Sequence, residues 1–183
     1  MTGAPRGYAI SGPDAAAALD WLLGESPVVI NLSLEGPDNK ILQIVVARLI
    51  EEGVPVVAAA GNQGPTAPPE YPGAFPGVIA VTAIDRYKQV YPMANRGNYI
   101  ALSAPGVEIW TADQKGAGVL KDGTSFAAPF VTAAVAQLKA ADTHLAPAAI
   151  SKALRQHALD LGLPGPDPVF GAGLLQMPAC KVE

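Results

Sequence analysis

The sequence predicts an α/β fold in which a mostly parallel sheet lies between two layers of helices. Strand-like and helix-like segments alternate along the 183 residues, which is the pattern of strand–helix–strand units. The strand-like segments are continuous apolar runs without polar alternation, as expected for strands covered on both faces. The helix-like segments carry an apolar face that can cover such a sheet. The length suits one domain with a core of its own, so we expect residues 1–183 to form a single domain.

The first half of the chain predicts two helices and two buried strands. Apolar side chains recur at helical spacing in the helices; Asp14 lies near the start of the first, and Gly53 ends the second. The strands are rich in Val and Ile, which favour β-structure. In order, these elements are a helix at residues 14–23, a strand at 28–34, a helix at 39–52 and a strand at 54–60.

The second half predicts further strands and two more helices after a proline-rich loop. The helix that begins at Ser125 is nearly all apolar, so we expect it to be buried at the centre of the fold. Residues 171–175 predict either a terminal turn or a short strand. In order, the other elements are strands at 78–84 and 99–104, a short strand at 106–111, a helix at 125–140 and a helix at 147–159.

The composition excludes several classes of protein. Half of the residues are apolar and only 15% are charged, which favours a core-forming chain over a disordered one. The formal charge of −4 argues against nucleic acid or an anionic membrane surface as a partner. The sequence has no apolar run of about 18 residues, so it predicts no membrane span. Residues 1–7 lack a basic start followed by an apolar stretch, so we expect that they are not a signal peptide. The single cysteine, Cys180, excludes an internal disulfide and a cysteine-based metal site.

Ser125 is the first candidate for chemistry. A glycine-containing turn, Gly-Thr-Ser at residues 123–125, places this serine in the first turn of the predicted apolar helix. Free backbone amides and the positive end of the helix dipole favour a developing negative charge there. Ser125 therefore suits the nucleophile of an acyl transfer. Taken alone, the same serine can be an ordinary helix cap.

Asn62 is the second candidate. It follows Ala-Ala-Ala-Gly at residues 58–61, at the carboxyl end of a predicted buried strand. Open parallel sheets build their sites at this end, and a side-chain amide there can donate to an oxyanion that forms over a serine. A lone asparagine in a loop can instead satisfy its own turn.

Together, these segments resemble the C-terminal part of the catalytic domain of the subtilisin-like serine peptidases, peptidase family S8. The likeness runs from about residue 15 to residue 175, and its ordered motifs make it specific. An α/β-hydrolase esterase would instead need Gly-x-Ser-x-Gly around the serine, which is absent. The matching stretches are Val-Ile-Asn-Leu-Ser-Leu at 29–34, Ala-Ala-Gly-Asn at 59–62, Tyr-Pro-Gly at 71–73, Pro-Gly-Val-Ile-Ala-Val at 76–81, Ala-Pro-Gly-Val at 104–107 and Gly-Thr-Ser-Phe-Ala-Ala-Pro at 123–129.

The resemblance implies a serine endopeptidase that acts on polypeptides. Ser125 would attack the scissile carbonyl, and Asn62 with the Ser125 backbone amide would hold the oxyanion. The family also implies a cis peptide bond before Pro72, a secreted or periplasmic location, and calcium binding, although this sequence identifies no calcium site and no cofactor. The residues that would line the peptide cleft are Ser33, Leu34 and Glu35 on one side and Ala59, Ala60 and Gly61 on the other.

The family's catalytic Asp and His have no counterpart in this chain. In the family they precede the strand that matches residues 28–34, and fewer than thirty residues precede it here, with no histidine among them. The two histidines, His144 and His157, follow the serine helix, where we expect surface positions. Without a base, Ser125 is an ordinary alcohol, so we expect negligible peptidase activity from the isolated chain. The alternative is a non-catalytic pseudopeptidase that binds peptide or a partner protein through the retained cleft.

Without the family's upstream strands, residues 28–34 become an edge of the sheet. An apolar, uncharged edge strand is a pairing site, so we expect this edge to pair with a second copy or with an upstream fragment.

Two positions depart from the family pattern. The family usually has glycine at Glu35 and often histidine at Phe130. Glu35 either narrows the cleft, favours basic residues, or is a solvated loop charge that does neither. Phe130 is expected to pack in the core.

Overall fold

The computed structural model describes residues 10–112 and 116–177, so residues 1–7 and Cys180, considered above, lie outside the described residues. The elements are α1 (Gly12–Gly24), β1 (Ile30–Leu32), α2 (Lys40–Glu51), β2 (Val56–Ala59), β3 (Ile79–Ile84), β4 (Ile100–Pro105), β5 (Ile109–Ala112), β6 (Gly118–Lys121), α3 (Thr124–Ala141) and α4 (Pro147–Gln156).

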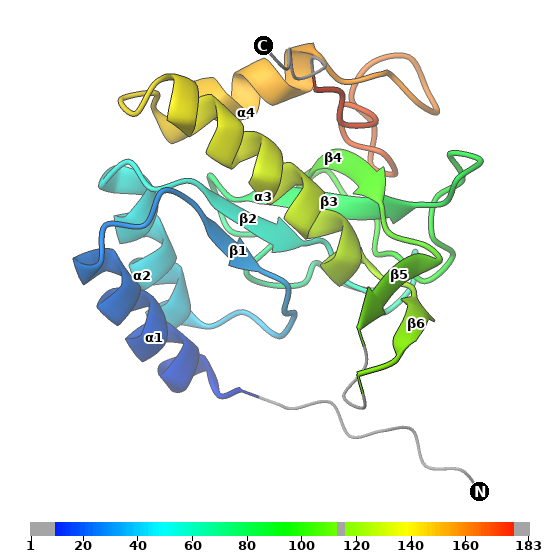
Figure 1. Cartoon of the computed structure of the whole chain (residues 1–183). Coiled ribbons are helices and arrows are strands. Elements are labelled where there is room, and N and C mark those ends of the chain that lie inside the picture. The colour runs from blue at the N-terminus through cyan, green and yellow to red at the C-terminus, as the bar shows by residue number, and fades with distance from the viewer. Residues whose placement is uncertain (1–9, 113–115, 178–183) are drawn as a thin grey trace, which may run out of the picture.

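Four parallel strands form the main sheet of the described residues in the order β1-β2-β3-β4. The helices α1 and α2 lie on one face of this sheet, and α3 crosses the other (Figure 1). The predicted three-layer α/β/α fold is therefore confirmed. Because all strands run the same way, the carboxyl ends of β1 and β2 lie at one edge of the sheet, where α3 begins.

Alternate side chains of the strands fill two separate cores. Val56 of β2 faces α1 and α2, whereas the next residue, Val57, faces α3. This alternation is the period of two of a pleated strand. On one side Leu19, Val46 and Leu49 pack against Ile30, Leu32 and Val56; on the other Ala127, Val131 and Val135 pack against Val57, Val81 and Leu102.

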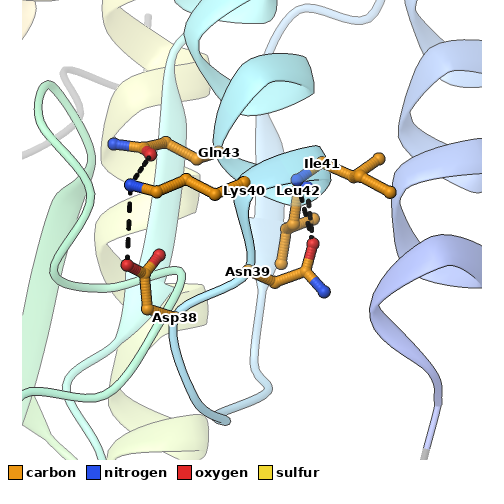
Figure 2. Close-up of polar contacts among 6 residues, drawn as sticks. All are labelled: Asp38, Asn39, Lys40, Ile41, Leu42 and Gln43. Atoms are coloured by element: carbon orange, nitrogen blue, oxygen red, sulfur yellow. Dashed lines mark hydrogen bonds and ion pairs between the residues drawn. The ribbon is translucent and has the colours of Figure 1, made fainter.

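Polar side chains fix the starts of the first two helices. The Ser11 hydroxyl accepts a hydrogen bond from the Asp14 backbone amide at 3.2 Å, so α1 begins two residues earlier than predicted. Asn39 Oδ1 accepts from the amides of Ile41 and Leu42 at 3.0 Å and caps α2, as Figure 2 shows. Both contacts satisfy amides that a helix start leaves free.

The strand predicted at residues 28–34 is shorter, and the prediction that both of its faces are buried is wrong. Ile30 and Leu32 are buried, but Asn31 between them is exposed. Asn31 points toward α3, where its Oδ1 accepts from the Thr132 hydroxyl at 2.9 Å. The predicted edge position of this strand is confirmed, since among the described strands β1 pairs with β2 and no other. Because the sheet ends there, one face of β1 reaches solvent.

The prediction that the serine helix is buried at the centre of the fold is wrong in part. Ala127, Val131 and Ala134 face the sheet, but the opposite side of α3 is exposed. Phe130 was expected in the core and is 43% exposed. It directly precedes Val131, and consecutive helical residues point about 100° apart, so Phe130 turns away from the sheet.

The C-terminal segments differ from the sequence prediction in three places. The strand expected at 106–111 is β5, which pairs antiparallel with the unpredicted β6 and not with the main sheet. The last helix ends at Gln156, three residues before its predicted end. Residues 171–175 form isolated bridges, in which Leu174 pairs with Ser103 and with Leu159.

Candidate active site

The two predicted motif segments meet where β2 ends and α3 begins. Asn62 Oδ1 accepts hydrogen bonds from the Thr124 amide at 2.9 Å and from the Thr124 hydroxyl at 3.1 Å. The same hydroxyl accepts from the Gly61 amide at 3.2 Å. Gly123, the N-cap residue of α3, has no side chain to cap the helix, so Asn62 performs this task from another element. Ser125 is the residue that follows this junction.

Gly123 is needed for the backbone conformation at the junction. Its φ of 145° is one that side-chain-bearing residues rarely adopt. Its amide donates to the Gly106 carbonyl at 2.8 Å, and its carbonyl accepts from the Phe126 amide at 3.0 Å. The turn therefore connects the β6 hairpin to α3 in a fixed geometry.

The carbonyl of Ser125 is held by Ser33. In a regular helix this carbonyl would accept from the amide of residue 129, but Pro129 has no amide hydrogen. The Ser33 hydroxyl donates to the Ser125 carbonyl instead, at 2.9 Å. Ser33 follows the last residue of β1, so this bond fixes the first turn of α3 to the end of the edge strand.

Ser125 itself is half-buried. Within the described ranges its hydroxyl and its backbone amide form no hydrogen bond to other protein groups, so both remain available to a ligand. The amide lies in the first turn of α3, where the helix dipole favours negative charge.

Neither histidine lies near Ser125. His144 follows the C-terminal end of α3, and the helical rise places that end about 24 Å from Ser125. His157 caps α4, where its Nδ1 atom lies 2.8 Å from the Ala153 carbonyl oxygen, and it lines a pocket with Leu138, about 20 Å along α3 from Ser125. Both side chains are exposed, as predicted.

The Glu35 carboxylate forms hydrogen bonds with Asn62 and is not simply solvated. Its Oε2 accepts from the Asn62 amide at 2.7 Å and from Asn62 Nδ2 at 3.2 Å, and its Oε1 accepts from Gln63 Nε2 at 2.8 Å. The side chain is half-buried, so its interpretation as a solvated loop charge is wrong. Because Nδ2 carries two hydrogens and Glu35 uses one, the other remains free to donate to an oxyanion.

The predicted cleft residues differ in what they expose. Leu34 is half-buried, whereas Ala59, Ala60 and Gly61 are buried. The Ala60 carbonyl already accepts from the Tyr99 hydroxyl at 2.7 Å, and the Gly61 carbonyl accepts from the Asn95 amide at 3.0 Å. This side of the predicted cleft can therefore form a wall, but the carbonyls of Ala60 and Gly61 already accept hydrogen bonds from within the protein.

Three residues that support the site were not predicted from the sequence: Thr124, Asn95 and Tyr99. Asn95 is fully buried, and its Oδ1 accepts from the Gln63 amide at 2.8 Å while its Nδ2 donates to the Pro68 carbonyl at 2.9 Å. Burial raises the pKa of Tyr99 to about 12, which keeps its hydroxyl protonated as the donor to Ala60. No sequence motif marked Asn95 or Tyr99, whose partners lie far away in the chain.

The described ranges offer no metal centre: no three His, Cys, Asp or Glu side chains gather there in a way that could hold an ion. Among the helices the structure describes, none combines the length and the apolar character that crossing a membrane requires. The Tyr71–Pro72 peptide bond is cis, as the family resemblance implied.

The arrangement of sheet, serine helix and Asn62 is that of a subtilisin-like serine peptidase. The sequence model of the Subtilase family, peptidase S8, matches residues 5–173, and the chain belongs to this family. It is 35% identical over 162 residues to the minor extracellular protease Epr of Bacillus subtilis (strain 168), an alignment that covers 88% of this chain and 25% of that protein. It is 30% identical to subtilisin DY of Bacillus licheniformis over 89% of this chain and 60% of that protein.

Solved structures agree with the family assignment. Fervidolysin from Fervidobacterium pennivorans, described as a keratinolytic enzyme related to subtilisin, superposes with a TM-score of 0.82 at 29% identity and covers 90% of this chain. Sphericase gives a TM-score of 0.82 at 26% identity and covers 92%. The chain spans 28% of the fervidolysin chain and 64% of the sphericase chain, so it corresponds to part of these relatives.

Proposed function

We propose that this chain carries the nucleophile and oxyanion half of a serine endopeptidase centre. The observation that supports this most directly is the pair of hydrogen bonds from Thr124 to Asn62, because they join the two motif segments immediately before Ser125. Polypeptide is the substrate class that the family implies.

In the proposed reaction, Ser125 Oγ attacks the carbonyl carbon of the scissile peptide bond. Its proton passes to a base, and the carbonyl oxygen becomes an oxyanion. The free hydrogen on Asn62 Nδ2 and the Ser125 amide donate to this oxyanion. The peptide lies between the half-buried segment Ser33, Leu34 and Glu35 and the buried wall of Ala59, Ala60 and Gly61.

The base is proposed to come from outside these 183 residues. His144 follows the end of α3, about 24 Å along the helix from Ser125, and His157 lines a pocket with Leu138, about 20 Å along the helix from Ser125. The chain has no other histidine. We therefore expect negligible hydrolysis by the isolated chain. In the described part of the chain, one edge of β1, next to Ser33, has no partner strand. We propose that a segment bearing the Asp and His, or a second copy of this chain, pairs with the sheet there.

A non-catalytic peptide-binding protein is the second candidate. The observation in its favour is that, among the described residues, the Ser125 hydroxyl forms no hydrogen bond with a basic side chain. A separate proposal concerns location: we propose that the chain is secreted, because its relative Epr is named an extracellular protease.

A two-part experiment tests the proposal. The isolated chain is incubated with a fluorophosphonate probe and followed by intact mass; we expect no adduct at Ser125 within minutes, and rapid labelling would contradict the external base. The chain is then fused to the segment of subtilisin DY that bears the family's Asp and His. We expect the fusion to cleave a fluorogenic peptide and Ser125→Ala to abolish cleavage, with His157→Ala as a neutral control. A folded but inactive fusion would favour the non-catalytic candidate.

A further inference from the structure

A pocket of about 600 Å³ lies beside the proposed oxyanion site. Glu35, which is bound to Asn62, lines it together with Gln63, Glu70 and Tyr71. Gly36 and Tyr71 form an antiparallel bridge across it, and prolines complete its walls. Because Glu35 both lines this pocket and accepts a hydrogen bond from Asn62, the pocket adjoins the proposed reaction centre.

The pocket is negatively charged, and only one of its carboxylates is paired with a cation. Asp38 lies 3.7 Å from Lys40 Nζ, a contact that Figure 2 shows at the start of α2. No Lys, Arg or His of the described ranges forms an ion pair with Glu35 or Glu70. Burial, and secondly the negative charge of Glu35, raise the pKa of Glu70 above its ordinary range. Two neighbouring carboxylates therefore lack a compensating charge.

The position of Glu35 connects this charge to the chemistry. Its Oε2 lies 3.2 Å from the Asn62 nitrogen that we propose donates to the oxyanion. A negative oxyanion on the other hydrogen of that nitrogen would be repelled by the carboxylate. A cation in the pocket would offset this repulsion at the moment the oxyanion forms, and it would also neutralise Glu70.

We propose that Glu35 and Glu70 are specificity-determining residues that select a substrate with arginine or lysine in this pocket, next to the scissile bond. This inference rests on the proposed peptide cleft. A volume of about 600 Å³ accepts a long side chain, whose aliphatic stem can lie along Tyr71 and the prolines while its charged end reaches the carboxylates. Three properly placed ligands for a bare metal ion do not occur among the described residues.

The test measures peptide binding by the isolated chain, so it does not depend on catalysis. Three peptide amides of the same length differ only in the last residue: arginine, norleucine (the neutral control) or glutamate. Binding is followed through the backbone amide signals of Asn62 and Gln63 in ¹⁵N-labelled protein. We expect the arginine peptide to bind about tenfold more tightly than the norleucine peptide, the glutamate peptide to bind most weakly, and the arginine preference to shrink as salt is raised.

Variants identify the residues responsible. Glu35→Gln and Glu70→Gln are each expected to reduce the arginine-to-norleucine ratio about threefold, and the double variant to bring it near one. Glu51→Gln, an exposed substitution on α2, is the matched control and should leave the ratio unchanged. Circular dichroism confirms that each variant is folded.

The outcomes separate this inference from the proposed function. Equal affinity for arginine and norleucine peptides in the unaltered chain would refute charge selection and leave the peptide cleft intact. An unchanged ratio in the folded double variant would refute the assignment to Glu35 and Glu70. If no peptide shifts the backbone amide signals of Asn62 and Gln63, both the proposed peptide cleft and the proposed selectivity for arginine or lysine are refuted.

Discussion

The hydrogen bond from the Ser33 hydroxyl to the Ser125 carbonyl can be tested by removing its donor. Ser33→Ala leaves this carbonyl without a partner, because Pro129 cannot supply the usual helical amide. A typical intramolecular hydrogen bond contributes about 0.5–1.5 kcal/mol, and Ser125 is half-buried, so water can replace only part of the loss. We expect the free energy of unfolding to fall by about 1 kcal/mol, measured by urea denaturation followed by circular dichroism.

A second substitution isolates the cause. Pro129→Ala supplies an amide hydrogen that can donate to the Ser125 carbonyl, which has two lone pairs and tolerates both donors. In the Pro129→Ala variant, Ser33→Ala should therefore lower the free energy of unfolding by about 0.5–1 kcal/mol less than it does in the unaltered chain. This difference is the coupling energy of the double-mutant cycle formed by the two substitutions. Ser33 also accepts a hydrogen bond from Asn31 Nδ2 at 2.9 Å, but that loss is common to both backgrounds and cancels. The same cost in both backgrounds would refute the reasoning.

Three further predictions concern residues around the site and the sheet. Asn62→Ala removes the cap of α3 and leaves the amide of buried Thr124 unpaired, so urea denaturation should show a loss of about 2 kcal/mol; a loss near zero would contradict the capping role. Thr82→Val should raise the free energy of unfolding by about 1 kcal/mol, since the hydroxyl is buried without a partner in the described structure, whereas Thr82→Ser should not. Because the folded-state pKa of Glu70 is raised above 4.5, the folded chain binds this proton more tightly than the unfolded chain, and the stability it contributes is lost as pH rises through that pKa. Glu70→Gln should therefore lose less stability than the unaltered chain between about pH 4.5 and pH 7, and parallel curves for the two proteins would contradict the raised pKa.

The order and type of most elements could be predicted because burial on a parallel sheet leaves a strong local pattern. Val56–Ala59 and Ile79–Ile84 are buried along their whole length and appear in the sequence as apolar runs. Gly118–Lys121 is mostly exposed and pairs with β5 outside the main sheet, so its residues carry no such pattern. The exposure of Phe130 could not be predicted either, because it depends on which side of α3 meets the sheet.

The candidate site was only partly predictable for a related reason. Ser125 and Asn62 belong to short motifs, which are local in the sequence. The contacts that hold them join residues far apart: Ser33 lies 92 residues from Ser125, and Glu35 lies 27 residues from Asn62. Sequence alone therefore left the alternatives for Glu35 open, and its hydrogen bonds with Asn62 and Gln63 in the structure exclude a solvated loop charge.

The contacts around Ser125 also indicate how the proposed centre is divided between this chain and the segment that would supply the base. Asn62 Oδ1 fixes the start of α3, while Nδ2 keeps a hydrogen for the oxyanion, so one side chain serves both stability and the proposed chemistry. Ser33 fixes the same turn from the other side. Each of these contacts lies within the described part of this chain, and none uses His144 or His157. The proposed nucleophile and the proposed oxyanion donors can therefore be positioned before any base arrives. In that proposal, a segment that pairs with the edge of β1 would need to supply only the base and the group that orients it.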